Sequence, residues 1–148
     1  TPPGDRPLTY SDKLGYFEGI LDNMWEYRFL HRDLEHLMAD NAALQSRYQQ
    51  FAHQVMQQGQ LVFKALVAAG LVEASEEELR SLVINIWVIS TSWISFLHTS
   101  GLFGASDTIR REHLMRGIYQ IIQLEAPYLR GEAQARIDDL KIRYQTIS

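Results

Sequence analysis

The stretch that decides the fold is LRSLVINIWVISTSWISFL, residues 79–97. Its apolar residues recur at spacings of three and four, which predicts a helix. One face consists of Leu79, Val83, Ile86, Trp93 and Leu97. A second face consists of Ile84, Trp87, Val88, Ile94 and His98. A helix covered on one side only shows a single apolar stripe opposite a charged face. Because this stretch has no Lys, Arg, Asp or Glu after Arg80, we expect both of its sides to be buried.

Two arrangements would bury both sides of this helix. It could run through the middle of one chain, or one side could face the core and the other a second copy. A bundle of five or six helices has little room for a fully interior helix, so the pattern favours a homodimer. The small residues Ser90, Thr91, Ser92 and Ser95 would let another backbone come close.

The segment around residues 114–122 has a similarly broad apolar surface. Two helices from each subunit would then form a four-helix interface. The residues predicted at this interface are Ile84, Val88, Thr91, Ser95, Leu114, Ile118, Ile121 and Ile122.

Outside this stretch the sequence also predicts helices and no strands. Thr9 or Ser11 is placed to cap a first helix, Asn41 a long one, and Ser75 another whose capping box is completed by Glu78. Gly70 and Gly101 are placed to stop the preceding helices. A further helix is expected from 106 to about 126 and a last one from 131 to 144. The expected fold class is all-α, with five to six helices.

Composition limits the function. A chain of 148 residues suffices for one core, and the absence of cysteine excludes disulfides and thiolate chemistry and fits the cytoplasm. The net charge of −4, without a basic run, excludes unaided binding to DNA. Polar residues interrupt the apolar run at 82–97, which is shorter than a membrane span, so no membrane partner is expected.

Aromatic and methionine side chains indicate a ligand cavity between the helices, because they form adaptable apolar walls. The candidates are Trp25, Met56, Phe63, Asn85, Trp87, Trp93 and His98. Each apolar member could equally be ordinary core. Asn85 and His98 need polar partners on an otherwise apolar helix. A ligand, a neighbouring carbonyl or the same residue across a dimer axis would serve.

Catalysis and metal binding have little support in the sequence. His31, Asp33, Glu35 and His36 lie close together, but their spacing matches no established metal site, and a solvated charged turn explains them better. No nucleophile motif and no phosphate-binding loop occurs, so we expect neither an enzyme nor a cofactor.

Three segments carry a family resemblance. WEYRFLHRDL at 25–34 resembles the "YRFL-x-RDL" segment in one branch of the TetR-type bacterial transcriptional regulators. ALVAAGL at 65–71 and NIWVISTSWISF at 85–96 agree with that branch in the same order. PPGDRPLT at 2–9 is similar to the join that follows its DNA-binding domain.

This resemblance implies an N-terminal helix-turn-helix domain for operator DNA and a C-terminal helical body that dimerises and receives a small apolar effector. Since no such segment precedes the matching stretches, we expect this sequence to be the C-terminal body without that N-terminal domain. Residues 1–9 would be its linker, and residues 10–148 the effector-binding and dimerisation domain. DNA would be bound only through the missing domain, and the effector would change that affinity by shifting populations. The alternative is a helical homodimerisation module that binds no ligand.

Overall fold

The computed structural model describes residues 9–145, without the side chains of residues 29–32 and 106. Every named element in this range is helical, which confirms the all-α prediction. The linker expected at residues 1–9 lies almost wholly outside the described residues. The α-helices are α1 (Tyr10–Glu26), α2 (Arg28–Ala39), α3 (Ala42–Ala68), α4 (Glu76–Ser100), α5 (Arg111–Glu125), α6 (Gly131–Ala135) and α7 (Ile137–Tyr144).

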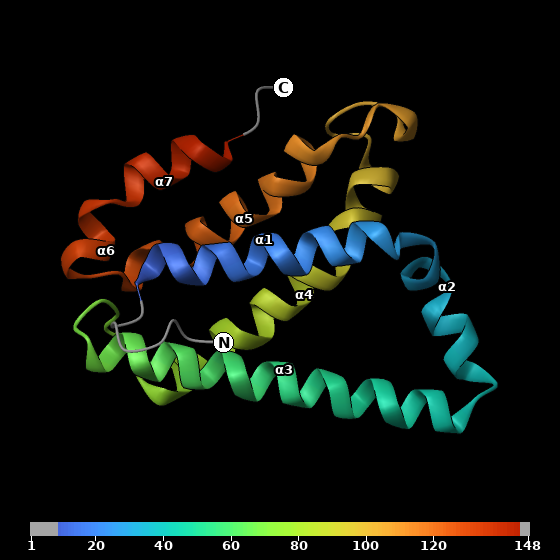
Figure 1. Ribbon diagram of the computed structural model, residues 1–148, viewed down its shortest axis with the longest axis horizontal. Helices are drawn as coiled ribbons and strands as arrows, with labels where there is room; N and C mark the ends of the chain where they lie inside the picture. The colour runs from blue at the N-terminus through green and yellow to red at the C-terminus, as the bar shows by residue number, and fades with distance from the viewer. Residues whose placement is uncertain (1–8, 146–148) are drawn as a thin grey trace.

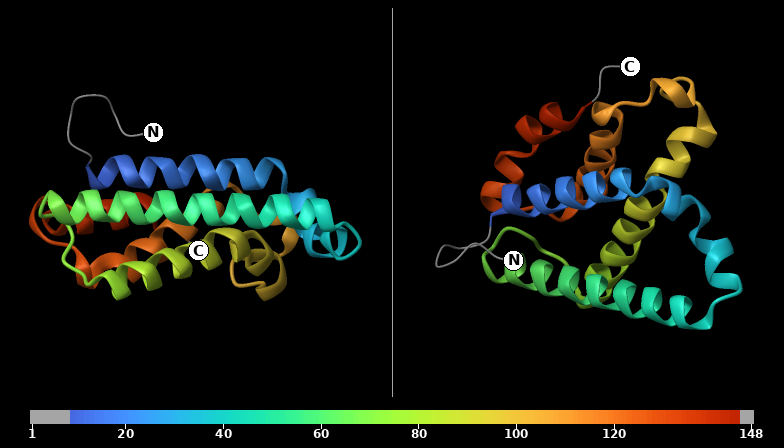
Figure 2. Two further views of the ribbon diagram at one scale, coloured as in Figure 1. Left: turned by 90° about the horizontal axis from the view of Figure 1, so that it is seen from below. Right: turned by 45° about the vertical axis from the view of Figure 1, so that its right-hand side comes forward.

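The helices form two sides of the molecule. α1 and α3 lie on one side, and α4 and α5 lie on the other (Figures 1 and 2). α2 joins α1 to α3 at one end, where it packs against both. α6 and α7 complete the chain beside α5.

The predicted helix starts are present. Thr9 and Asp12 form a capping box at α1, Asn41 caps α3, and Ser75 and Glu78 form a capping box at α4. Each such cap stabilises its helix by about 1 kcal/mol. Gly101 ends α4 in the left-handed conformation, with φ of 64°. These boundaries follow from local sequence alone.

The helix expected from residue 106 begins later than predicted. Residues Ser106–Thr108 form one 3-10 turn, and α5 starts at Arg111. Between them Ile109 has extended backbone and a buried side chain. The chain therefore anchors Ile109 in the core before the long helix starts. The helix predicted at 131–144 is divided at Arg136 into α6 and α7.

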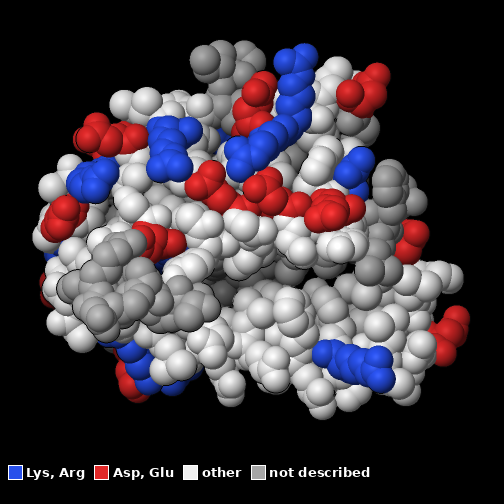
Figure 3. Space-filling model, viewed as in Figure 1, with Lys and Arg blue, Asp and Glu red and all other residues white. Residues whose placement is uncertain are grey.

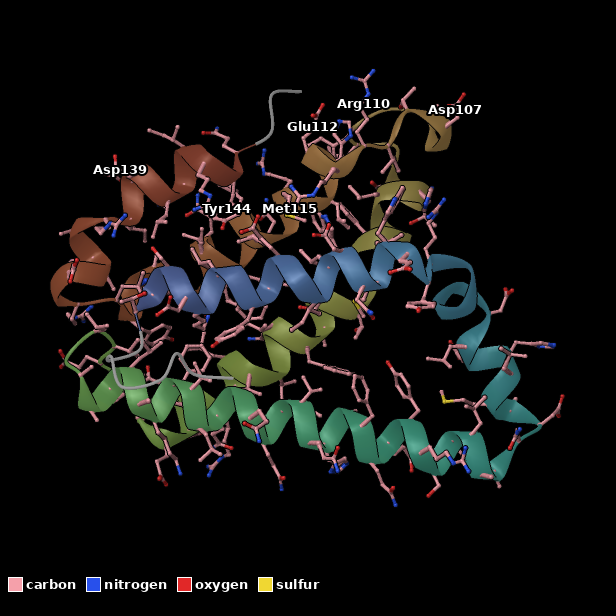
Figure 4. The ribbon with its side chains drawn as sticks, in the orientation of Figure 1. Asp107, Arg110, Glu112, Met115, Asp139 and Tyr144 are labelled. Atoms are coloured by element: carbon pink, nitrogen blue, oxygen red, sulfur yellow. The ribbon has the colours of Figure 1, made fainter. Side chains whose placement is uncertain are left out.

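The most enclosed long helix is α5, not α4. α5 packs against α4, α1 and α7, and its Leu114, Ile118, Ile121 and Ile122 are fully buried inside one chain. Met115 of α5 and Tyr144 of α7, labelled in Figure 4, belong to the same core. At Gly117, α5 approaches the ring of Trp93 on α4.

The helix α4 is covered on one side only. Leu79, Leu82, Val83, Ile86, Trp93 and Leu97 form its core side. By length and composition it could cross a membrane, with a mean hydropathy of 1.4 over its most apolar window. Only 33% of that window is buried within the chain. The expectation that both sides of α4 are covered is therefore not met within a single chain.

Candidate functional site

The first candidate site is a hollow between α1 and α3. α3 packs on α2 and α4, and α1 packs on α5 and α4, whereas α1 and α3 are not packed along their lengths. Figure 3 shows the surface hollowed along the line between them, with charged side chains gathered over α1 and few over α3. The wall formed by α3 is therefore the less charged one.

Three aromatic rings line the α3–α4 side of this region. The ring of Tyr48 lies 6.2 Å from that of Phe51 and 6.2 Å from that of Trp87, and the rings of Phe51 and Trp87 are 6.3 Å apart. Phe51 is 52% exposed, and the other two are half-buried. Burial raises the pKa of Tyr48. These rings pack against one another but stay outside the main core, so they are free to contact an apolar molecule. We call Tyr48, Phe51 and Trp87 the aromatic cluster.

The predicted ligand residues are only partly brought together. Trp87 belongs to the aromatic cluster, and Met56 lines a shallow groove between α3 and α4. Trp25 lies in the last turn of α1 with the Arg28 guanidinium 4.2 Å from its ring centre. Trp25, Met56 and Trp87 thus remain candidates. Tyr48 and Phe51, which lie one turn apart on α3, were not among the predicted ligand residues.

The other four predicted ligand residues lie elsewhere. Phe63 and Trp93 are core residues, and the indole N–H of Trp93 donates to the carbonyl of His113 at 3.1 Å. Asn85 and His98 are exposed, and neither belongs to the aromatic cluster. Because both side chains are open to solvent, they need no ligand in a single chain.

A second candidate site is the outward side of α4 and α5. Ile84 and Val88 are 54% and 53% exposed, and Ser95 is exposed beside them. Thr91 is half-buried and donates its hydroxyl to the carbonyl of Trp87 at 2.8 Å. These four α4 residues are available to a partner, as the interface prediction requires. The four predicted on α5 are enclosed in the core of one chain, so α5 could offer only its opposite side.

That opposite side of α5 carries Arg116, Tyr119, Gln120 and Gln123, which recur at helical spacing. Leu124 meets Ser81 and Asn85 of α4 across a shallow depression, so the outward sides of the two helices adjoin. We call Ser81, Ile84, Val88, Ser92, Ser95, Arg116, Tyr119 and Gln123 the α4–α5 face. It is mostly uncharged, with small residues on α4, which suits close contact with another helix pair.

A buried polar cluster fastens α1 to α5. Lys13 forms an ion pair with Glu125, whose other oxygen accepts a hydrogen bond from the hydroxyl of Tyr10 at 2.6 Å. All three side chains are buried. The Lys13 ammonium also lies 4.5 Å from the ring centre of Phe17 and 4.7 Å from that of Phe63. Burial lowers the pKa of Lys13 against the opposing effect of Glu125, and burial raises the pKa of Tyr10.

A surface network continues this attachment along α1. Glu18 pairs with Arg111 of α5 at 3.7 Å and with Arg143 of α7 at 3.4 Å. It also accepts a hydrogen bond from the hydroxyl of Tyr144 at 3.0 Å. Burial, followed by this bond, raises the pKa of Tyr144 to about 12. α1 is thus held to α5 and α7, and near its start the Lys13 cluster also contacts Phe63 of α3.

No candidate metal site is found in the part of the chain that the structure describes. No three His, Asp or Glu side chains gather there in a way that could hold a metal ion. The side chain of His31, one of the four residues weighed as ligands, lies outside the described side chains.

Comparison with known proteins points to bacterial regulators. The family model TetR, described as a bacterial transcriptional repressor, matches residues 1–137. Among solved structures, a TetR-family transcriptional regulator from Marinobacter aquaeolei VT8 is similar to this chain, with a TM-score of 0.82 and 33% sequence identity. The similarity covers 97% of this chain and 67% of that one. No curated protein matches.

Proposed function

This chain belongs to the TetR family of bacterial transcriptional repressors, and from that premise we propose that it is an effector-binding and dimerisation domain. In this proposal a small apolar molecule binds at the aromatic cluster, and two copies pair through the α4–α5 face. Operator DNA is bound by a separate helix-turn-helix domain joined before α1. The protein acts in the cytoplasm without catalysing a reaction.

The observation that carries this proposal is the position of α4. The helix contributes Trp87 to the aromatic cluster and exposes Ile84 and Val88 on the α4–α5 face. Exposing the apolar surface of a helix to water is unfavourable. Exposed apolar patches of this kind mark interaction sites. A ligand on one side and a second copy on the other would cover both.

The DNA side of the proposal rests on charge and on similarity. A net charge of −4 gives this domain little attraction to phosphates. The similar regulator from Marinobacter aquaeolei VT8 has about a third of its chain outside the region of similarity, because 67% is covered. A separate DNA-binding segment in the parent protein is consistent with both facts.

The proposed signal passes through α1. The Lys13–Glu125 pair and the Glu18 network hold α1 to α5 and α7, whereas beyond the Lys13–Phe63 contact α1 is not packed on α3. A molecule in the hollow would therefore push on α1 and, through these contacts, on α5 and α7. The effector then changes DNA affinity only by its preference for one spacing of the two DNA-binding domains.

A ligand screen tests the effector site. The chain is screened with a library of apolar small molecules by thermal shift, because a ligand bound only by the native state raises its stability. The expected result is saturable stabilisation that Phe51→Ala abolishes. Leu61→Ala is the matched control, since Leu61 is 58% exposed on the same helix but outside the aromatic cluster. If the Phe51→Ala variant is stabilised as much as the unaltered chain, the ligand binds outside the aromatic cluster and the proposed site is wrong.

Sedimentation equilibrium tests the dimer. We expect the chain to be dimeric at micromolar concentration and Val88→Glu to make it monomeric, because a charge would be buried without a partner. Dimers without any response to the library would favour the alternative, a homodimerisation module that binds no ligand. Monomers of the unaltered chain would refute the proposed dimer.

A further inference from the structure

Arg116 pairs with no acidic side chain in the part of the chain that the structure describes. Its guanidinium carbon lies 4.3 Å from the ring centre of Tyr119 and 5.7 Å from that of Phe103. Its Nε is buried and has no hydrogen-bond partner among the described residues. Leaving such a donor unsatisfied is unfavourable, and the penalty is larger for a charged group. The side chain as a whole is only half-buried on α5, and no ion pair with a described residue engages it, so its guanidinium is available to an acceptor that another molecule would supply.

Glu77 is a complementary acceptor at the other end of the α4–α5 face. Its neighbours are already engaged: Glu78 accepts from the backbone N–H of Ser75 at 2.9 Å, and Glu76 lies 3.8 Å from Lys64. Glu77 has no basic partner in the part of the chain that the structure describes. It lines the shallow depression, of about 330 Å³, between the start of α4 and the end of α5.

The two residues lie at opposite ends of one face. Gly117, next to Arg116, meets Trp93 in the second half of α4. Leu124, at the other end of α5, and Pro127, just after that helix, line one depression together with Glu77 and Ser81 at the start of α4. α4 and α5 therefore run in opposite directions, and the uncharged residues Ile84 and Val88 lie between the two charged groups.

A two-fold axis would bring these unlike charges together twice. In an isologous dimer the same surface of both copies is in contact. When the two-fold axis runs perpendicular to the helices, each end of this face meets the opposite end in the other copy. We propose that two copies of this chain pair about an axis near Val88, and that Arg116 of each copy enters the depression of the other and pairs with Glu77. The inference rests on the proposed homodimer and adds the contact that orients it.

This contact would select the orientation of the dimer. Side-by-side pairing in the same direction would set Arg116 against Arg116 and Glu77 against Glu77, and like charges in contact disfavour that arrangement. The small and apolar residues between them allow close approach but specify no direction. The reciprocal ion pairs would therefore decide how the two α1 helices, and any domains before them, are spaced.

Complementary charge reversals test the inference on the full chain. Arg116→Glu sets Glu against Glu77 twice in its homodimer, and Glu77→Arg sets Arg against Arg116 twice in its own. Each variant alone should dimerise about tenfold more weakly or worse, from two unfavourable contacts in place of two favourable ones. In an equimolar mixture every contact of the heterodimer joins unlike charges, so dimerisation should return to that of the unaltered chain. The double variant should also dimerise normally.

The controls separate this contact from a general effect of charge or folding. Arg47→Glu on α3 and Glu132→Arg on α6 reverse exposed charges outside the α4–α5 face and should leave dimerisation unchanged. Circular dichroism of each variant should retain the helical signal. Two results would overturn the Arg116–Glu77 contact while leaving the homodimer intact. Either both single reversals dimerise as well as the unaltered chain, or they dimerise more weakly and mixing them does not restore dimerisation. A monomeric unaltered chain would overturn both.

Discussion

The close approach of α5 to α4 makes Gly117→Ala a sensitive test of the core. A Cβ at this position would lie 2.9 Å from Cδ1 of Trp93 and 3.1 Å from both its Cγ and its Nε1. These distances are shorter than carbon–carbon contact at 3.5–4.0 Å, so the ring or the helix has to move. Movement of the ring is restricted, because Trp93 is 7% exposed, donates to the carbonyl of His113 and stacks on Phe96 at 5.3 Å.

Two opposing effects determine the change in stability. Alanine favours a helix over glycine by about 1 kcal/mol. Overpacking a rigid core costs about 1–3 kcal/mol, and the upper part of that range applies to a hydrogen-bonded, stacked indole. Gly117→Ala should therefore lower the free energy of unfolding by about 1–2 kcal/mol net.

Gly19→Ala is the matched control. Gly19 lies on the exposed side of α1, and a Cβ there would meet nothing within 4 Å. Only the helix preference then acts, and the variant should be more stable by about 0.4–1 kcal/mol. Urea unfolding followed by circular dichroism measures both variants, at one protein concentration because any dimerisation adds to apparent stability. If Gly117→Ala stabilises the chain as much as Gly19→Ala does, the proposed tight contact between α4 and α5 is refuted.

The buried ion pair and the tyrosine network lead to two further predictions. Lys13→Met leaves the Glu125 carboxylate buried without its cation and should lower the free energy of unfolding by about 3–5 kcal/mol. Adding Glu125→Gln should recover most of that loss in urea unfolding, and a double variant as unstable as Lys13→Met would contradict this explanation. For Tyr144, the pKa raised from 10.0 to about 12 means that the native state keeps a proton that the unfolded state loses. Its stabilising effect is complete below pH 10 and is lost as the pH rises through about 12, so Tyr144→Phe should reduce the fall in stability between these values. An equal fall in both proteins would show that Tyr144 does not titrate in this way.

Local sequence predicted the features that depend on neighbouring residues. The caps at Thr9, Asn41 and Ser75 form because each side chain reaches the amide three residues later. Gly101 ends α4 because glycine adopts the left-handed conformation without strain. The outward position of Ile84 and Val88 followed from the spacing of apolar residues on α4. The resemblance to TetR-type regulators also came from the sequence, and the family match confirms it.

The spacing of apolar residues did not predict which part of the molecule covers each apolar side. Residues 79–97 and 114–122 both show broad apolar surfaces, and the pattern requires only that each be covered. In the structure α1, α4 and α7 enclose the second segment, so Leu114 and Ile118 became core while α4 kept an open side. The roles of α4 and α5 at an interface could not be separated without the packing.

Even chemically identical side chains on one helix can have different environments, which the sequence pattern does not predict. Trp87 and Trp93 lie on one helix, yet Trp87 joins the aromatic cluster and Trp93 is enclosed against Gly117. Lys13 and Glu125 are 112 residues apart, and the local sequence around either residue does not predict that they pair in the core. Sequence by itself determined where most helices form, their capped starts and their apolar sides, because backbone hydrogen bonds and side-chain spacing act over a few residues. Only the tertiary structure decided which sides face one another, because burial depends on segments that are distant in the chain.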